Sequence, residues 1–376
     1  MLTRLKISNF KLHKLTEMKL GTLTILTGMN GTGKSSVIQA LMTLRQSAFT
    51  SMLPVNLNLR GDMCDVGSSD DAESHDLTGE SDELNIEMDF KDMKSLNYSF
   101  KYEVGGERDK TYLNGHEEPE MSMQQRKEYS LFNQNCQYIS ACRLGPQRYY
   151  PKDNYTVDHL RQISKKNGQS EYTVNFLSTF GNEDIKIKTL YLEGREAEDY
   201  KDYTLATQVE RWLGRISPDI KVKIDNVGDD FRLNFEYKKS TVKAINEAFG
   251  VPYTLPIIVA VLSSGKDALL MIENPEAHLH PSGQAALMKL LTKAAAEGVQ
   301  IILETHSDHI INGALVAVKR EILNKDDLAV CFFERDEAVH KAVCHQLEIM
   351  DDGRISRPPK GFFDQMDIDL NILTGF

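Results

Sequence analysis

The chain has 376 residues, of which 41% are apolar and 26% charged, and it carries a formal net charge of −11. This is the composition of a globular protein with one large or two ordinary domains, and no run of about 18 apolar residues is present to cross a membrane. Five cysteines without a CxxC pair exclude a disulfide scaffold and a zinc ribbon. We therefore expect a cytoplasmic protein with no membrane partner, in which a contact with DNA needs a local basic patch, such as Arg143–Arg148 or Lys238-Lys239.

Two strands and a helix are predicted near the N-terminus. Apolar residues alternate over 2–7, and a second apolar run over 23–26 leads directly into a glycine-rich segment. After that segment, apolar residues recur at the three- and four-residue spacing of an amphipathic helix, at Val37, Ile38, Leu41, Leu44 and Ala48. The order strand, glycine-rich turn, helix is the setting in which a phosphate-binding loop occurs.

The segment from Gly28 to Ser36, GMNGTGKSS, fits the pattern GxxxxGK[ST]. Its glycines let backbone N–H groups point at phosphate, and the N-terminus of the following helix adds the positive end of a dipole. Lys34 is expected to reach the β- and γ-phosphates of ATP, and Ser35 to place its hydroxyl on Mg²⁺. The predicted nucleotide-binding residues are Gly28, Asn30, Gly31, Thr32, Gly33, Lys34, Ser35 and Ser36.

The middle of the chain is predicted to form inserted β-hairpins, because apolar and polar residues alternate in the stretches 84–90, 96–104, 186–192, 220–224 and 231–237. The last third alternates instead between strands and helices. Strands are expected at 268–272, 299–303 and 328–333, and helices at 282–297 and from about 308. This order predicts an α/β fold with a doubly wound, mostly parallel sheet.

The apolar strand that ends at Glu273 is predicted to supply the second half of the nucleotide site. A carboxylate at such a strand end holds magnesium through water beside the P-loop, and the segment LETHS, 303–307, ends the next strand. The carboxyl ends of parallel strands lie at one edge of a doubly wound sheet, where ligands bind. Ser35 and Glu273 are therefore the predicted metal residues.

Four segments, taken in order, carry a family resemblance: LKISNFK at 5–11, the P-loop, IENPEAHLHP at 272–281 and ETHSDHIING at 304–313. Together they resemble the ABC-type ATPase heads of the RecF, SMC and OLD-nuclease group. The resemblance is strongest to bacterial AAA-type ATPases of unknown function that share IENPEAHLHP, YISA-x-R-x-GP and a GFFDQ-type tail, which stands here at 361–365. It covers the chain from Leu2 to about Leu373.

The resemblance implies a single ABC-type head over residues 1–376. Its expected parts are a P-loop lobe at 1–150, an inserted region at 151–250, a lobe with the magnesium strand and the switch histidine at 251–335, and a tail at 336–376. It also implies that two heads close on ATP, with the P-loop of one facing the signature segment of the other, so the expected oligomer is at least a dimer. His306 matches the switch histidine that contacts the γ-phosphate in such heads; a solvent-exposed residue in a helix-capping cluster is the other reading.

Two positions depart from the family pattern. ABC heads usually carry Asp-Glu where this chain has Glu273-Asn274, and an amide can hydrogen-bond the attacking water but cannot take its proton. A missing general base typically costs about 10²–10⁴ in rate, so slow hydrolysis is expected, with Glu276 as a candidate substitute or else a loop cap. In the signature segment, 248–253, Pro252 replaces a serine and can donate no hydrogen bond. The predicted catalytic residues are Glu273, Asn274, Glu276 and His306.

Several further residues admit two readings. Arg143 ends a strand and is expected either to contact phosphate or a partner, or to form a surface salt bridge. His278 and His280 make an HxH pair with too few ligands for structural zinc, so packing within the HLHP turn is the preferred reading. The Q-loop glutamine has three candidates, Gln46, Gln137 and Gln147.

These features predict an ATP-binding, slowly hydrolysing RecF-like head whose nucleotide-dependent dimerisation controls a separately encoded effector, for instance a nuclease, in DNA-related or phage-defence processes. The alternative is a dimeric scaffold that holds ATP without turnover, motivated by Asn274 and Pro252. A nuclease site within this chain is not expected, because about 70 residues follow His306 and their acidic side chains are expected to be solvated.

Overall fold

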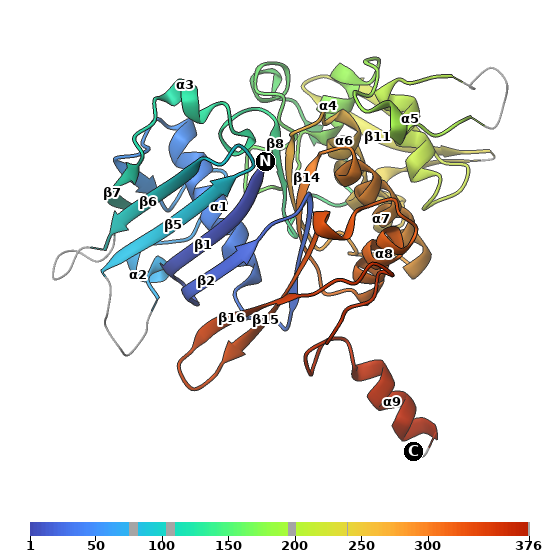
Figure 1. Ribbon diagram of the computed structural model, residues 1–376. Coiled ribbons are helices and arrows are strands. Elements are labelled where there is room, and N and C mark those ends of the chain that lie inside the picture. Colours follow the sequence, from blue (N-terminus) through green and yellow to red (C-terminus); the bar gives the residue numbers. More distant parts are fainter. Residues whose placement is uncertain (75–81, 103–109, 195–200, 239, 375–376) are drawn as a thin grey trace.

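A mostly parallel six-stranded sheet lies at the centre of the fold, in the order β16-β15-β3-β14-β13-β8 (Figure 1). This computed structural model describes residues 1–374 except 75–81, 103–109, 195–200 and 239. Only the edge strand β16 runs antiparallel to its neighbour in this sheet. The strands are β3 (Leu23–Gly28), β8 (Cys136–Ile139), β13 (Leu269–Glu273), β14 (Gln300–Glu304), β15 (Leu328–Asp336) and β16 (Lys341–Leu347). The predicted α/β fold with a doubly wound, mostly parallel sheet is confirmed.

A second, antiparallel sheet lies beside the first, with the helix α1 (Lys34–Phe49) packed between them. Its order is β2-β1-β5-β6-β7-β4. One core joins both sheets to α1, because Leu41 of the helix, Ile7 of β1 and Ile302 of β14 belong to the same buried cluster. The strands are β1 (Leu2–Phe10), β2 (His13–Lys19), β4 (Asn56–Asn58), β5 (Glu83–Phe90), β6 (Ser95–Lys101) and β7 (Tyr112–Glu118), with the short helices α2 (Ser69–Ala72) and α3 (Met123–Arg126) beside them.

Three helices cover the other face of the parallel sheet: α6 (Gly250–Ser263), α7 (Pro281–Ala296) and α8 (Asp308–Lys319). Alternate residues of each central strand point to opposite faces, so Ile301 packs with these helices whereas Ile302 packs with α1. In α6, 12 of 14 residues are buried, as expected for a helix that is apolar on all sides. The sheet is therefore covered on both faces, and its carboxyl edge remains for a ligand.

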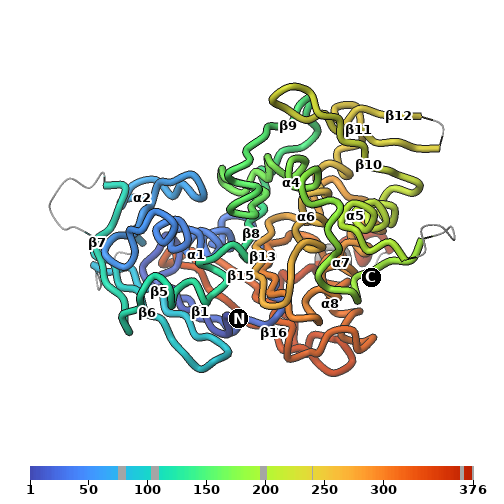
Figure 2. Tube along the Cα trace, turned by 90° about the horizontal axis from the view of Figure 1, so that it is seen from above, coloured from blue at the N-terminus to red at the C-terminus, as the bar shows by residue number. Residues whose placement is uncertain are grey.

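A third, smaller sheet forms a separate end of the molecule when it is viewed from above (Figure 2). It consists of β10 (Lys221–Val227), β11 (Asp230–Tyr237) and β12 (Ser240–Lys243), with β9 (Tyr150–Pro151) paired to β11. The helices α4 (Thr173–Phe180) and α5 (Leu205–Leu213) lie beside it, and α9 (Gln365–Thr374) extends away from the body of the protein at the C-terminus (Figure 1). Among the described residues, no helix is both long and apolar enough to span a bilayer.

Most of the predicted hairpin strands are present. The stretches 84–90 and 96–104 correspond to β5 and β6, although residues 103 and 104 lie outside the described part, and 220–224 and 231–237 correspond to β10 and β11. The prediction of a strand at 186–192 is wrong. Here Lys188–Leu190 forms a 3-10 turn, and the Leu190 carbonyl accepts a hydrogen bond from the Trp212 indole N–H at 2.9 Å. A side chain of α5, rather than a neighbouring strand, thus supplies the hydrogen bond to the Leu190 carbonyl.

Candidate nucleotide site

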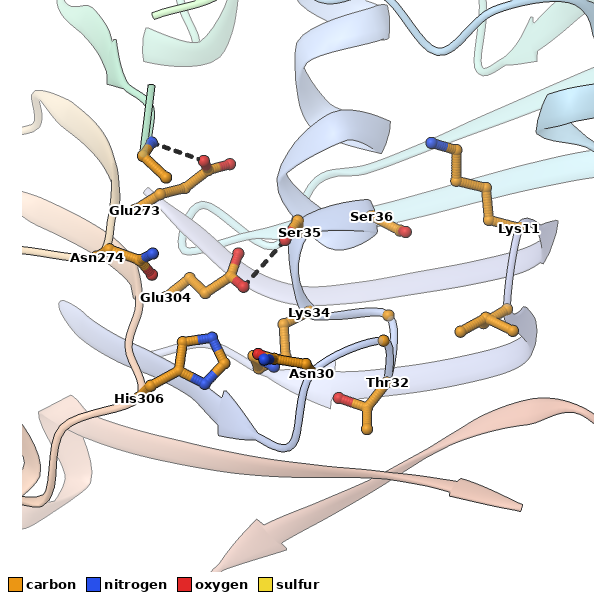
Figure 3. Close-up of a pocket in the computed structure, with 14 residues that line it drawn as sticks. Lys11, Asn30, Thr32, Lys34, Ser35, Ser36, Glu273, Asn274, Glu304 and His306 are labelled. Atoms are coloured by element: carbon orange, nitrogen blue, oxygen red, sulfur yellow. Dashed lines mark hydrogen bonds between the residues drawn. The ribbon is translucent and has the colours of Figure 1, made fainter. Parts of the chain in front are cut away.

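A cavity of about 440 Å³ lies at the carboxyl edge of the parallel sheet (Figure 3). The P-loop forms one wall, and the ends of β13 and β14 form the opposite wall. The turn between β1 and β2 contributes a third side. The lining residues are Lys11, Leu12, Asn30, Gly31, Thr32, Gly33, Lys34, Ser35, Ser36, Ala141, Glu273, Asn274, Glu304 and His306. The structure thus brings most of the predicted site residues together; Gly28 and Glu276 stand just outside this lining.

Two glycines shape the P-loop. Gly28 ends β3 with φ at 134°, and a Cβ there would lie 2.1 Å from the Phe333 carbonyl oxygen on β15. Gly33 adopts φ 97° immediately before the first residue of α1. Both conformations lie where side chains are disfavoured, so the loop needs glycine at each end to turn from strand into helix.

Lys34 is folded along the P-loop. Its ammonium group donates to the carbonyl oxygens of Gly28 at 3.0 Å and Met29 at 2.6 Å, and Thr32 donates its hydroxyl to the Met29 carbonyl at 2.8 Å. Burial lowers the pKa of Lys34. The lysine is therefore held inside the loop, at the cavity wall where phosphate is expected.

His13, at the start of β2, contacts the P-loop at Gly33. The sequence did not predict this contact. The Nε2 atom of His13 lies 2.9 Å from the Gly33 carbonyl oxygen, and its Nδ1 lies 2.8 Å from the Thr16 hydroxyl. A carbonyl can only accept, so Nε2 carries the proton and Nδ1 accepts from Thr16. Burial lowers the pKa of His13 to about 4, which keeps the imidazole neutral near pH 7.

Two carboxylates face the P-loop from neighbouring strand ends. Glu304 accepts a hydrogen bond from the Ser35 hydroxyl at 2.9 Å. Glu273 accepts from the Tyr138 hydroxyl and from the Ala141 backbone N–H, both at 2.9 Å. The sequence assigned Ser35 and Glu273 to the metal, whereas in the structure the acid in contact with Ser35 is Glu304.

The environment of Glu304 is unusual for a carboxylate. The residue is 6% exposed, and its Oε2 is buried without a hydrogen-bond partner among the described residues. Burial, reinforced by the charges of Glu273 and Glu276, raises its pKa to about 7, although the Ser35 hydroxyl and Lys34 act in the opposite direction. Oxygen donors of this kind suit Mg²⁺, so the residues present fit the expected metal.

The loop after β14 carries the predicted switch histidine. The imidazole of His306 lines the cavity, and its pKa is lowered by partial burial and then by the charge of Lys34. Glu276, in the turn that follows β13, holds this loop in place, because its carboxylate accepts from the His306 backbone N–H and from the Thr305 hydroxyl, each at 2.8 Å. In this geometry Glu276 does not line the cavity itself but fixes the position of the His306 backbone.

Arg143 is neither a phosphate contact nor a surface salt bridge. It is buried, and its guanidinium donates to backbone carbonyls of Ser140, Tyr253, Glu273 and Asn274 at 2.8–3.1 Å. Asn274 adopts φ 43° at this point, a left-handed conformation that asparagine tolerates. Arg143 thereby joins the end of β13 to the beginning of α6.

The signature segment forms the exposed beginning of α6. Phe249 is 57% exposed and its ring lies 5.4 Å from that of His278, centroid to centroid. Pro252 is buried. His278 also packs against Tyr253, while His280 caps α7 by accepting from the Ser282 N–H. The HLHP turn thus has packing and capping roles in this structure.

The remaining predictions concern glutamines and basic residues. The side-chain amide of Gln46 donates a hydrogen bond to the Asn58 carbonyl, and that of Gln137 donates to the Arg161 carbonyl. None of the three Q-loop candidates lines the cavity in the described part of the chain. Of the two basic patches, Arg148 lines a hollow of about 310 Å³ with Arg232 and Lys243, and Lys239 lies outside the described residues.

The sequence did not assign three residues that shape the site: Lys11, His13 and Glu304. Lys11 was part of the LKISNFK segment, and Glu304 ends a predicted strand, so both had a signal in the sequence. No pattern marked His13. His13 contacts Gly33 only because the fold places β2 next to the P-loop.

The fold and this site define a P-loop ATPase head of the ABC type. The chain belongs to the family described as "AAA domain, putative AbiEii toxin, Type IV TA system", which matches residues 23–312. Residues 323–373 match a second family, described as a protein of unknown function (DUF3696). The predicted relation to ABC, SMC and OLD-type heads is confirmed.

Known proteins with related sequence or fold support the same class. An OLD nuclease of Thermus scotoductus is 21% identical over 369 residues, an alignment that spans 90% of this chain and 65% of that relative. An SMC head bound to the C-terminal winged-helix domain of ScpA has a TM-score of 0.54 at 14% identity over 92% of this chain and 98% of that one. An SMC head with an extended coiled coil, in a complex derived from Pyrococcus furiosus, gives 0.51 at 12% identity over 100% of this chain and 98% of that one. At these identities the two structures show the fold alone.

Proposed function

We propose that this protein is a cytoplasmic ATP-binding head that hydrolyses ATP slowly in the presence of Mg²⁺. Its nucleotide-dependent dimerisation controls a separately encoded effector, in DNA-related or antiviral-defence processes. The observation that carries this proposal is the cavity in which the P-loop, Glu273, Glu304 and His306 meet.

The side chains suggest how such a site acts on ATP. P-loop N–H groups and Lys34 bind the phosphates. Ser35 and a carboxylate hold Mg²⁺, which neutralises phosphate charge when bound. His306 contacts the γ-phosphate, and Asn274 orients a water molecule by a hydrogen bond but cannot remove its proton. Because Glu276 accepts hydrogen bonds from the switch loop and Asn274 cannot take a proton, neither residue next to the usual position of the base is free to act as one, which supports slow turnover.

A second candidate is a scaffold that binds ATP without turnover and assembles the effector as a dimer. Two observations favour it: Asn274 occupies the position of the usual base, and Pro252 is buried at the position of the signature serine. The two candidates differ in one quantity, the rate of ATP hydrolysis.

Magnesium-dependent ATP turnover by the purified protein tests the proposal, with Lys34→Ala as the blank and with duplex DNA present or absent. We expect slow turnover that falls at least about 100-fold in Lys34→Ala, because the variant loses the ammonium group that contacts the phosphates. ATP binding with no turnover above the blank would select the scaffold. Stimulation by DNA would support a role for the hollow beside Arg148. The proposal of a separately encoded effector is contradicted if the chain, expressed without the neighbouring genes, shows the full cellular activity of its locus.

A further inference from the structure

The small sheet has a gap along one edge of β11. β10 pairs with the whole length of this strand on one side, so β12 and β9 both pair on the other side. β12 pairs with β11 only over 234–237, and β9 only over 230–231. Among the described strand pairs, residues 232 and 233 therefore have partners on β10 alone. A hollow of about 310 Å³ lies at this gap, and its polar and charged lining includes Gln147, Arg148, Tyr149, Arg232, Lys243 and Asn246.

The hollow has an excess of positive charge. Three cations line it, namely Arg148, Arg232 and Lys243, and no carboxylate does so among the described residues. None of the three forms a salt bridge within the described part of the chain. The acid opposite Arg232 on β10 is Asp225, which accepts from the Asn234 side-chain amide at 2.8 Å. Three cations around one hollow repel each other unless an anion lies between them, and this chain is otherwise acidic, with a net charge of −11.

An aromatic ring is held beside these cations. The pairing of Tyr150 with Phe231 places Tyr149 next to Arg232, which donates to the Tyr149 hydroxyl at 3.2 Å and lies 5.4 Å from the centroid of its ring. Tyr149 is nevertheless 42% exposed. Proteins bind an unpaired nucleotide with this combination, in which the base stacks on an aromatic ring and cations bind the phosphate. An arginine is especially suited to phosphate because two of its N–H groups can bind two oxygens.

We propose that this hollow binds a nucleotide phosphate, with Arg148, Arg232 and Lys243 on the phosphate oxygens and the unpaired base stacked on Tyr149. It shares no lining residue with the cavity at the P-loop, and it lies at the end of the molecule that carries β9, β11 and β12 (Figure 2). The site is therefore separate from the ATP site and goes beyond the proposed function. A free nucleotide and a nucleotide within a single strand offer the same chemistry.

Fluorescence anisotropy with a labelled oligothymidylate of about eight nucleotides, the length of a typical single-strand site, tests the proposal. Affinity should fall at least about 5-fold in Tyr149→Leu, which removes the stacking ring, and at least about 5-fold when glutamine replaces any one of the three cations. The slope of log affinity against log salt concentration should become shallower by about 0.7 for each cation lost, and should not change in Tyr149→Leu. The matched control is Lys221→Gln, because Lys221 is an exposed lysine of the same sheet that does not line the hollow. Its affinity and salt slope should equal those of the wild type.

Unlabelled dTMP distinguishes the two sources of the phosphate. Displacement of the strand by dTMP at a similar nucleotide concentration supports a free nucleotide as the ligand, whereas displacement only at large excess supports a single strand. Thermal unfolding verifies that each variant is folded. The proposal is overturned if neither probe binds the wild type, or if the three glutamine variants at Arg148, Arg232 and Lys243 bind like Lys221→Gln. Loss of strand binding in Lys34→Ala would also overturn it, because the nucleotide would then lie at the P-loop. ATP turnover does not enter this test, so the ATPase function stands or falls separately.

Discussion

At the scale of single residues, the P-loop depends on a neutral histidine beneath it. His13 is fully buried and bridges Thr16 to the Gly33 carbonyl. A Cβ on Gly33 would lie 3.2 Å from the imidazole, so the ring and the loop are in close contact. Protonation would place a charge in this buried site and remove the acceptor that Thr16 uses.

The pKa of His13 therefore predicts a pH-dependent stability. The folded-state pKa of about 4 lies below the ordinary value near 6.5. Folding thus favours the neutral ring, and this contribution is present above pH 6.5 and is lost as pH falls toward 4. Between pH 7.5 and pH 5, the wild type should lose about 2 kcal/mol of unfolding free energy more than His13→Gln, which keeps an N–H for Gly33. Urea unfolding at both pH values measures this, and equal losses in the two proteins would contradict it.

Individual residues also show where sequence reasoning stops. The P-loop roles follow from local spacing, because glycine, lysine and serine act within one turn of chain. The contacts of Glu304 and Arg143 depend instead on which strands are neighbours. Leu26 and Glu304 are paired across β3 and β14 although 278 positions separate them in the chain. No local pattern carries that information.

At the scale of elements, hydrogen bonds connect the segments that follow β8, β13 and β14 at the carboxyl edge of the sheet. Arg143 binds the carbonyls that end β13, and Glu276 binds the first residues after β14. The strands and helices here were predictable from their apolar periodicity. The hydrogen bonds between the loops were not predictable, since the sequence allows Glu276 to be a base or a loop cap and its partners, Thr305 and His306, lie in the loop after another strand, β14.

Substitution of Glu276 distinguishes a residue that positions the switch loop from a general base. If Glu276 takes the proton from water, Glu276→Gln should lose about 10²–10⁴ in turnover. We expect instead that Glu276→Gln stays within about 10-fold of the wild type, because glutamine still accepts from the His306 N–H. Glu276→Ala should lose more activity and should speed hydrogen exchange of amides 305–307, since it frees the loop. A glutamine variant as inactive as Lys34→Ala would restore the base assignment.

At the scale of the whole molecule, one exposed surface links the nucleotide cavity to an expected partner. The aromatic side chain of Phe249 stands at the beginning of α6 and packs on His278, in the turn that follows Asn274. Large exposed aromatic residues are typical of the centre of protein interfaces. The family resemblance predicts that a second head approaches ATP through this segment. Neither the periodicity of the sequence nor the single chain shows that contact.

Dimerisation through α6 can be tested on the intact protein. With Mg²⁺ and a non-hydrolysable ATP analogue, light scattering should give twice the chain mass of 42.6 kDa, and Phe249→Asp should remain monomeric because it places an unpaired charge in the interface. Its mant-ATP affinity should stay within about 3-fold of the wild type, since Phe249 does not line the cavity. Met93→Asp is the matched control, because Met93 is 95% exposed on the distant turn between β5 and β6. A Phe249→Asp protein that dimerises like the control would place the interface elsewhere.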